Sequence, residues 1–187
     1  MVVQIFRCPV TVDEIMDFFF KAMVLKSWAS GAQAKVTCDP FEQTEISFQD
    51  DVFWMLDRFC GNGYGPMSFG TTTIFVRDTL LRSWQPVWMM NYNGWCEKEA
   101  SCFVKRVLLY AYQQRKFNGG RGLDVDNSSP PMKYRNVVDP TSTFEQFSGF
   151  EYVNKFDAPT DPERTCLGWH KYSGMLLLGM SSLPFVR

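Results

Sequence analysis

Histidine is nearly absent from this chain, and closely spaced cysteine pairs are absent altogether. The 187 residues include one histidine, His170, and six cysteines, of which no two form a Cys-x-x-Cys pair. Structural zinc sites are built from closely spaced Cys and His ligands. We therefore expect no metal site, and no motif in the sequence points to a bound cofactor.

The chain also lacks an excess of either charge and any long apolar run. Lys and Arg number 19, Asp and Glu number 20, and the formal net charge is -1. Proteins that bind phosphate backbones carry a basic excess, so nucleic acid is disfavoured as a partner. The N-terminus lacks the basic and apolar segments of a secretory signal. The apolar stretch 18–25 is interrupted by Lys21 and is too short to span a membrane. These absences predict a cytoplasmic protein without a membrane segment, with reduced thiols.

Aromatic residues, in contrast, are abundant. The chain contains 17 Phe, 7 Tyr and 6 Trp, together 16% of its residues. Hydrophobic residues make up 45% and charged residues 21%, which is typical of a globular protein. The aromatic excess predicts a core of large rings or an aromatic-lined cleft.

Two segments have the hydrophobic spacing of helices. The first covers about 12–28 and begins with a capping box formed by Thr11 and Glu14. The second covers about 97–116 and ends at a pair of glycines. Six runs rich in strand-forming residues are at 42–48, 52–59, 68–77, 86–95, 143–156 and 166–178.

Short connections between successive strands favour antiparallel pairing. The sequence therefore predicts a single α+β domain over residues 1–187, with a mainly antiparallel sheet of about six strands and two main helices packed on it. Residues 118–142 are predicted to be an irregular loop, with at most a short strand at 132–135. Residues 179–187 are predicted to be an apolar tail.

Glu151 lies where an apolar residue is expected. Strand alternation places it on the same face as Phe147 and Val153. If residues 157–165 close an antiparallel hairpin, His170 lies opposite Glu151, whereas a register shifted by two residues brings Tyr172 there instead.

A buried carboxylate without a partner costs several kcal/mol. We therefore expect Glu151 to be at least half buried and to accept a hydrogen bond from His170, Tyr172 or Arg121. The contact is either a structural cross-strand pair or an acid–base pair. Asp57 and Arg58, in the middle of a strand, face opposite ways, so one of them needs a partner at or near the core, and Asp57 and Arg121 are natural candidates to pair.

Two glycine-rich segments do not fit phosphate-binding loops. Residues 61–65 lie between two strands, whereas a dinucleotide loop leads into a helix N-terminus. Residues 119–122 follow a helix C-terminus, which is the negative end of the helix dipole. Cys60 is a candidate nucleophile together with His170, although packed thiols are common.

Five short motifs occur in order between Val12 and Leu176. They are Asp57–Gly61, Trp88-Met89-Met90-Asn91-Tyr92-Asn93-Gly94, Arg121-Gly122, Phe147-x-Gly149-x-Glu151-x-Val153 and Tyr172-x-Gly174. Their order and spacing resemble an uncharacterised small-domain family, common in bacteria, which is found alone or behind an Xre-type helix-turn-helix.

The sequence departs from that family's pattern at Asn93, where Tyr is usual, after Gly122, where Pro is usual, and at Met175, where Gly is usual. The resemblance implies one domain and no particular activity. It marks as site candidates Trp88, Asn91, Tyr92, Arg121, Gly149, Glu151 and Tyr172.

These features favour a non-catalytic domain that binds a ligand or partner in an aromatic-lined pocket, because pockets combine apolar walls with a few polar groups. One alternative is a small enzyme that uses Glu151 and His170 for proton transfer, or Cys60 as nucleophile. Another is an interaction module that self-associates through the apolar segment 175–186. The expected partner is a small molecule or a protein, including a second copy of this chain. The candidate ligand-binding residues are Trp88, Asn91, Tyr92, Arg121, Glu151 and Tyr172.

Overall fold

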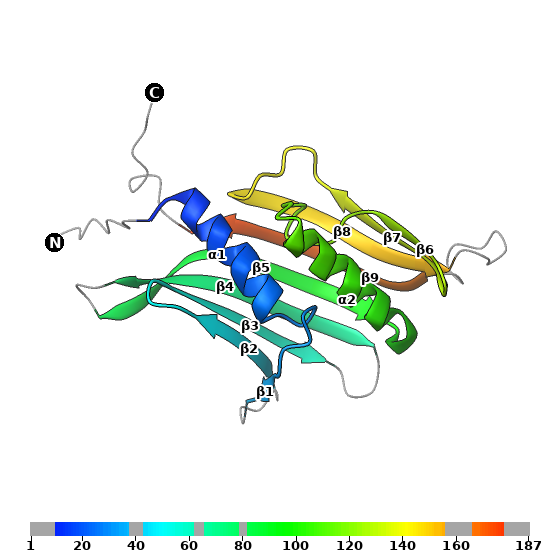
Figure 1. Ribbon diagram of the computed structural model, residues 1–187, viewed down its shortest axis with the longest axis horizontal. Helices are drawn as coiled ribbons and strands as arrows, with labels where there is room; N and C mark the ends of the chain where they lie inside the picture. The colour runs from blue at the N-terminus through cyan, green and yellow to red at the C-terminus, as the bar shows by residue number, and fades with distance from the viewer. Residues whose placement is uncertain (1–9, 38–42, 62–65, 79–81, 156–165, 178–187) are drawn as a thin grey trace.

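The computed structural model describes residues 10–37, 43–61, 66–78, 82–155 and 166–177. Its strands form one antiparallel sheet, and both helices lie on the same face of that sheet (Figure 1). The elements are α1 (Val12–Leu25), β1 (Lys35–Val36), β2 (Thr44–Gln49), β3 (Phe53–Gly61), β4 (Met67–Asp78), β5 (Ser83–Cys96), α2 (Lys98–Gln113), β6 (Val125–Ser128), β7 (Pro131–Val138), β8 (Gln146–Lys155) and β9 (Cys166–Leu176).

The sheet consists of two runs of sequential strands joined in the middle. Its nine strands follow the order β1-β2-β3-β4-β5-β9-β8-β7-β6. Helix α2 carries the chain from β5 to the far edge, where β6 begins. The chain then returns strand by strand until β9 pairs with β5. Residues far apart in the sequence therefore meet at the centre of the sheet.

The sheet is larger than the predicted six strands, and residues 118–142 are not an irregular loop. Strands β6 and β7 pair with each other, and β7 pairs with β8. The prediction was wrong because these strands lie toward one edge of the sheet and contain Asn, Ser and Pro, which favour turns. In β7 only Met132 and Tyr134 are buried, so the apolar alternation is short. Strand β1, at the opposite edge, has two residues and no such alternation.

Both helices are present but shorter than predicted. The capping box at the start of α1 is confirmed: the Glu14 backbone N–H donates to the Thr11 hydroxyl at 3.2 Å, and the Thr11 N–H donates to the Glu14 carboxylate at 2.7 Å. Helix α1 ends at Leu25 rather than near 28, and α2 ends at Gln113 rather than near 116. Helix α1 contacts β2 and β3, while α2 contacts β7 and β9. None of the described helices is long and apolar enough to cross a membrane.

Aromatic rings form the core between the helices and the sheet. The Phe19 ring lies with its centroid 5.1 Å from that of Trp88 and 6.0 Å from that of Tyr112. Trp88 is fully buried, and its indole N–H donates to the Phe144 carbonyl at 3.0 Å. Much of the aromatic excess in the sequence therefore serves packing.

On the helix-covered face of the sheet, some aromatic rings lie across a glycine on the neighbouring strand. A Cβ atom placed on such a glycine would approach the aromatic side chain to about 2.5 Å or less, far inside van der Waals contact. These glycines allow large side chains to lie flat under the helices. The three cross-strand pairs are Gly70 with Tyr92, Gly149 with Tyr172, and Gly174 with Phe147.

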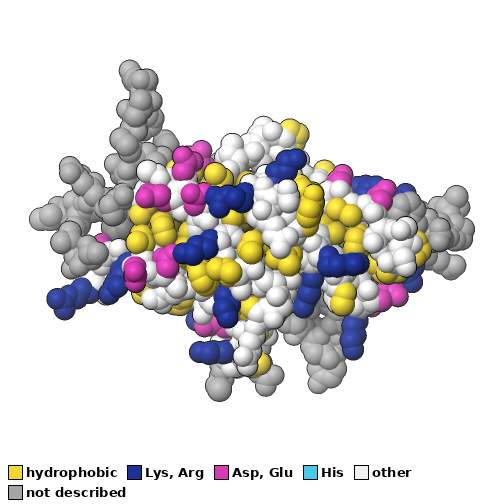
Figure 2. Space-filling view, viewed as in Figure 1, with side chains coloured by type: hydrophobic (Ala, Val, Ile, Leu, Met, Phe, Trp, Pro, Cys, Tyr) yellow, Lys and Arg dark blue, Asp and Glu magenta, His cyan; other side chains and the backbone are white. Residues whose placement is uncertain are grey.

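Figure 2 shows the face that carries the helices. Lys and Arg side chains are interspersed there with acidic and hydrophobic ones, rather than gathered into one basic surface.

Candidate functional site

One row of positions across the sheet carries three polar side chains that lie under the helices. Ser68 on β4 faces Gly94 on β5, and Gly94 faces His170 on β9. His170 in turn faces Glu151 on β8. Opposite residues of paired antiparallel strands share one face. The side chains of Ser68, His170 and Glu151 therefore project to the same side, with Gly94 between the first two.

The predicted register of the last hairpin is confirmed. Glu151 faces His170 and Gly149 faces Tyr172, so the register shifted by two residues does not occur. The register shifts between Val153, which faces Gly168, and Asn154, which faces Cys166. Residues 157–165, which were expected to close the hairpin, lie outside the described part.

Glu151 is almost fully buried, with 2% of its surface exposed, and it contacts four donors. Arg121 donates through Nε to Oε2 at 2.9 Å and through Nη2 to Oε1. The Tyr134 hydroxyl donates to Oε2, and His170 Nδ1 lies 3.3 Å from Oε1. A carboxylate offers about four acceptor positions, so this cluster uses all of them.

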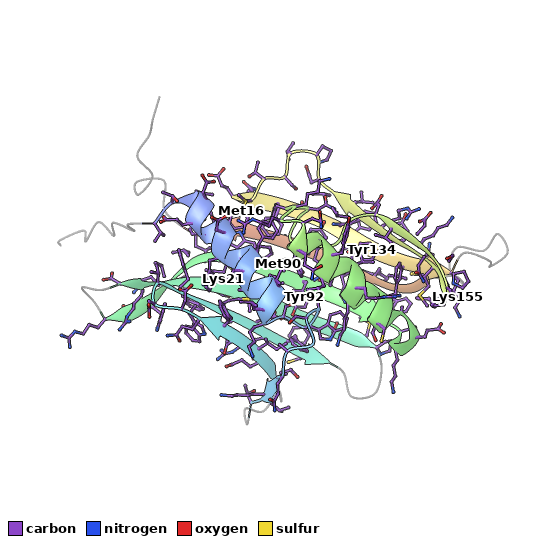
Figure 3. All side chains as sticks on the ribbon, viewed as in Figure 1. Met16, Lys21, Met90, Tyr92, Tyr134 and Lys155 are labelled. Carbon is purple, nitrogen blue, oxygen red and sulfur yellow. The ribbon has the colours of Figure 1, made fainter. Side chains whose placement is uncertain are left out.

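The expectation that Glu151 is buried and accepts from His170, Tyr172 or Arg121 is therefore confirmed through Arg121 and His170, whereas the Tyr172 hydroxyl donates to Asn136. Tyr134 was not anticipated, because it lies in the segment that the sequence assigned to a loop. Figure 3 shows Tyr134 behind α2, where its hydroxyl also accepts from the Gly122 N–H at 3.0 Å.

The contacts within this cluster favour the charged forms of Glu151 and Arg121. Burial alone raises the pKa of Glu151, but the charge of Arg121 and the hydrogen bonds from His170 and Arg121 outweigh it and lower the pKa to about 2. Burial lowers the pKa of Arg121, and the Glu151 carboxylate more than reverses that effect. Because the Glu151 carboxylate can only accept, its contact with His170 is a hydrogen bond when Nδ1 carries a proton, and in the tautomer with the proton on Nδ1 alone, Nε2 presents a lone pair.

A second buried carboxylate, Asp57, lies on the same face of the sheet. Its Oδ1 accepts hydrogen bonds from the Thr72 hydroxyl and the Tyr92 hydroxyl, each at 2.9 Å. Burial raises the pKa of Asp57 more than these hydrogen bonds and the charge of Arg121 lower it. The Arg121 guanidinium also lies 5.7 Å from the centroid of the Tyr92 ring. Arg121 is thus hydrogen-bonded to Glu151, whereas its effect on the pKa of Asp57 comes from its positive charge.

A cavity of about 360 Å³ opens beside these groups, between the helices and the sheet. It lies under the C-terminal end of α1 and most of α2, from Ser101 to Tyr112. In Figure 3, Met90 and Tyr92 lie beneath the two helices that form its roof. Its polar side chains include those of Ser68, Asp57, Thr72, Tyr92, Arg121 and His170. Its walls are largely apolar and include Met23, Trp28, Phe59, Met67, Met90, Val104, Leu108 and Tyr112.

The opposite face of the sheet carries further hollows, two of them of about 520 and 550 Å³. Neither is lined by a buried carboxylate. Of these three hollows in the described part of the chain, the cavity under the helices is the one where apolar walls meet buried charged groups.

The structure brings together only some of the residues that the sequence proposed for the site. Tyr92, Arg121 and His170 line the cavity. The Glu151 carboxylate contacts both Arg121 and His170.

The other three candidates lie elsewhere. Trp88 belongs to the core. Tyr172 is buried and donates from its hydroxyl to Asn136 Oδ1 at 2.6 Å. Asn91 lies on the opposite face of the sheet, where it is exposed and accepts from the Thr71 hydroxyl at 3.1 Å. Neighbouring residues of a strand face opposite ways, so Asn91 and Tyr92 do not share a pocket.

The structure also separates Cys60 from His170. Cys60 is three residues beyond Asp57 on β3 and projects to the opposite face, facing Phe69 of β4. These two residues therefore cannot act together as nucleophile and base. Within the described residues, no group of three or more His, Cys, Asp and Glu side chains is placed to hold a metal ion.

Self-association through the C-terminal segment stays a prediction. Met175 and Leu177 are exposed, while residues 178–187 lie outside the described part.

Replacing Asp57 by Asn is expected to stabilise the protein more at pH 8 than at pH 4. Because the folded protein raises the pKa of Asp57, it holds this proton more tightly than the unfolded chain does, and stability is lost as the pH rises past the unfolded value of about 3.9. Asn keeps an acceptor for the two hydroxyls without the charge. Thermal melts at both pH values should show a gain of a few degrees for the variant at pH 8. An equal effect of the substitution at both pH values would contradict this account of Asp57.

Comparisons of the chain with family models, with curated proteins and with solved structures found no match. The resemblance to the bacterial small-domain family therefore stays a prediction, and the function has to be argued from the site itself.

Proposed function

We propose that this protein binds a small amphipathic molecule in the cavity between its helices and its sheet. The observation that supports this is the combination of a volume of about 360 Å³, largely apolar walls and charged groups on one side. Small-molecule sites are commonly cavities of roughly 300–1,000 Å³ with apolar walls and a few placed polar groups.

The polar groups indicate the chemistry of the ligand. The charges of Arg121 and Glu151 offset each other, so the cavity does not present an unbalanced cation to an anionic ligand. Asp57 has its protein hydrogen bonds on Oδ1, which leaves Oδ2 to accept from a ligand. The Ser68 hydroxyl and the Nε2 atom of His170 add a donor and an acceptor. We infer an uncharged ligand with an apolar body and a hydrogen-bonding end.

The fluorescent amine N-phenyl-1-naphthylamine is a suitable probe, because it is neutral, apolar and carries one N–H donor. We expect its fluorescence to rise on addition of the full-length protein and to saturate at one molecule per chain. Absence of saturable binding would overturn the proposal.

Two tryptophan substitutions on α2 test whether the probe binds inside the cavity. Ser101 lines the cavity, so Ser101→Trp should fill it and weaken binding at least about tenfold. Cys102, the next residue, is exposed, and Cys102→Trp should bind as the wild type does. Equal weakening by the two substitutions, or by neither, would place the probe outside the cavity.

A further inference from the structure

We propose that Ser68, His170 and Glu151 form a triad of nucleophile, general base and orienting carboxylate that hydrolyses uncharged carboxylic esters with a small apolar acyl group. This inference rests on the proposed function, because the ester occupies the same cavity.

The three side chains are in contact in the required order. Ser68 Oγ lies 3.4 Å from His170 Nε2, and His170 Nδ1 lies 3.3 Å from Glu151 Oε1. The proton on Nδ1 points to the carboxylate, so Nε2 is the atom that can take the serine proton. Such contacts are often longer in a free enzyme than the 2.6–3.2 Å of a working complex, and they tighten when substrate binds.

The fold explains why these residues meet although they come from three strands. Ser68 and His170 lie on β4 and β9, on either side of β5. The β5 residue between them is Gly94, which places no side chain between the hydroxyl and the imidazole. A triad of this kind is defined by the geometry and roles of its members rather than by their order in the chain.

Glu151 is suited to orient His170 rather than to exchange protons. Arg121 and Tyr134 bind both of its oxygens, so the carboxylate cannot rotate away from the imidazole. It therefore stays ionised while His170 gains and loses a proton, as the carboxylate of a triad does.

Ser68 also has the access that a nucleophile needs. It is partly exposed, and it lines the cavity together with His170 and Arg121. Ser27, another serine in the lining, is buried and donates to the Met23 carbonyl at 2.7 Å, so its hydroxyl is already engaged.

In the first step Ser68 Oγ attacks the ester carbonyl carbon, and its proton passes to His170 Nε2. The bond between the acyl carbon and the alcohol oxygen then breaks, and the alcohol leaves with that proton. In the second step water attacks the acyl-serine, again giving a proton to His170. The carboxylic acid leaves as Ser68 regains its proton, so atoms and charges balance with water as the second substrate.

The test uses the full-length protein with a fluorophosphonate probe and with 4-nitrophenyl butyrate. We expect the fluorophosphonate to attach to one residue per chain, which peptide mapping identifies as Ser68. Ser68→Ala should abolish both the labelling and the saturable ester hydrolysis. His170→Asn should lower kcat at least about 100-fold, the range associated with loss of a general base. Ser173→Ala, an exposed serine on the opposite face of β9, should leave both readouts unchanged.

Binding of N-phenyl-1-naphthylamine separates failure of the triad from failure of the proposed function. If Ser68→Ala binds the amine as the wild type does but hydrolyses the ester equally fast, or if the fluorophosphonate labels another residue, the triad is overturned and the binding function stands. If the wild type binds neither compound, both proposals fall together.

Discussion

Glu151→Leu is expected to destabilise the fold by about 3–5 kcal/mol, because it leaves a buried cation without its counter-charge. The Arg121 side chain is 9% exposed, and its Nε and Nη2 atoms both donate to Glu151. The substitution also removes the acceptor for the Tyr134 hydroxyl and for His170. Urea unfolding at pH 7 measures the change in the free energy of unfolding.

Two other substitutions show whether charge and burial cause this loss. Glu151→Gln keeps the shape but turns an amide N–H₂ toward donors, so we expect a smaller loss than for Leu. Asp126→Asn breaks an exposed ion pair with Arg135 and should leave the stability almost unchanged. A loss below 1 kcal/mol for Glu151→Leu would show that Arg121 does not depend on this carboxylate.

The same ion pair gives a pH dependence with a definite sign. The pKa of Glu151 is about 2 in the folded protein and about 4.3 in an unfolded chain, so the unfolded chain binds the proton more readily. The contribution of Glu151 to stability is therefore fully present above the unfolded value and is lost as the pH falls toward 2. Glu151→Leu should lack this part of the acid destabilisation.

Gly94→Ala is expected to destabilise the protein by about 3 kcal/mol or more, at the upper end of the cost of overpacking. A Cβ at Gly94 would lie 1.9 Å from the backbone oxygen of Trp169 and 2.7 Å from the Cα of His170. These are backbone atoms of β9, which cannot swing aside as the end of a side chain can. Strands β5 and β9 would have to separate at the centre of the sheet.

Gly61→Ala is a matched control within the same sheet. A Cβ there would meet no described atom within 4 Å, so the change in the free energy of unfolding should be small. Similar urea midpoints for the two alanine variants would contradict the steric role assigned to Gly94.

The parts of the fold that could be predicted depend on neighbours in the sequence. The start of α1 follows from the Thr11 and Glu14 pair, which acts within one helical turn. The facing of Glu151 and His170 follows from one hairpin, whose strands are joined by a short connection. The burial of Glu151 then follows from alternation within a single strand.

The parts that could not be predicted depend on pairing between distant strands. Nothing near Ser68 in the sequence indicates that β5 pairs with β9, and only that pairing brings the hydroxyl to His170. The contact of Tyr134 with Glu151 was not predicted, because the strand that carries Tyr134 has the composition of a loop. Asn91 is a different case, since alternation alone should have placed it and Tyr92 on opposite faces.

The order of strands in the sheet also determines at which stage of folding the site can form. Strands β2 to β5 pair with sequence neighbours, and so do β6 to β9, so each half of the sheet needs only short loops to close. The junction of β5 with β9 joins segments far apart in the chain, and its loop-closure entropy must be overcome before its contacts contribute. Ser68, Asp57 and Tyr92 belong to the first half, whereas Glu151 and His170 belong to the second. During synthesis on a ribosome, the complete cavity can therefore appear only after the last strand has emerged and the two halves have joined.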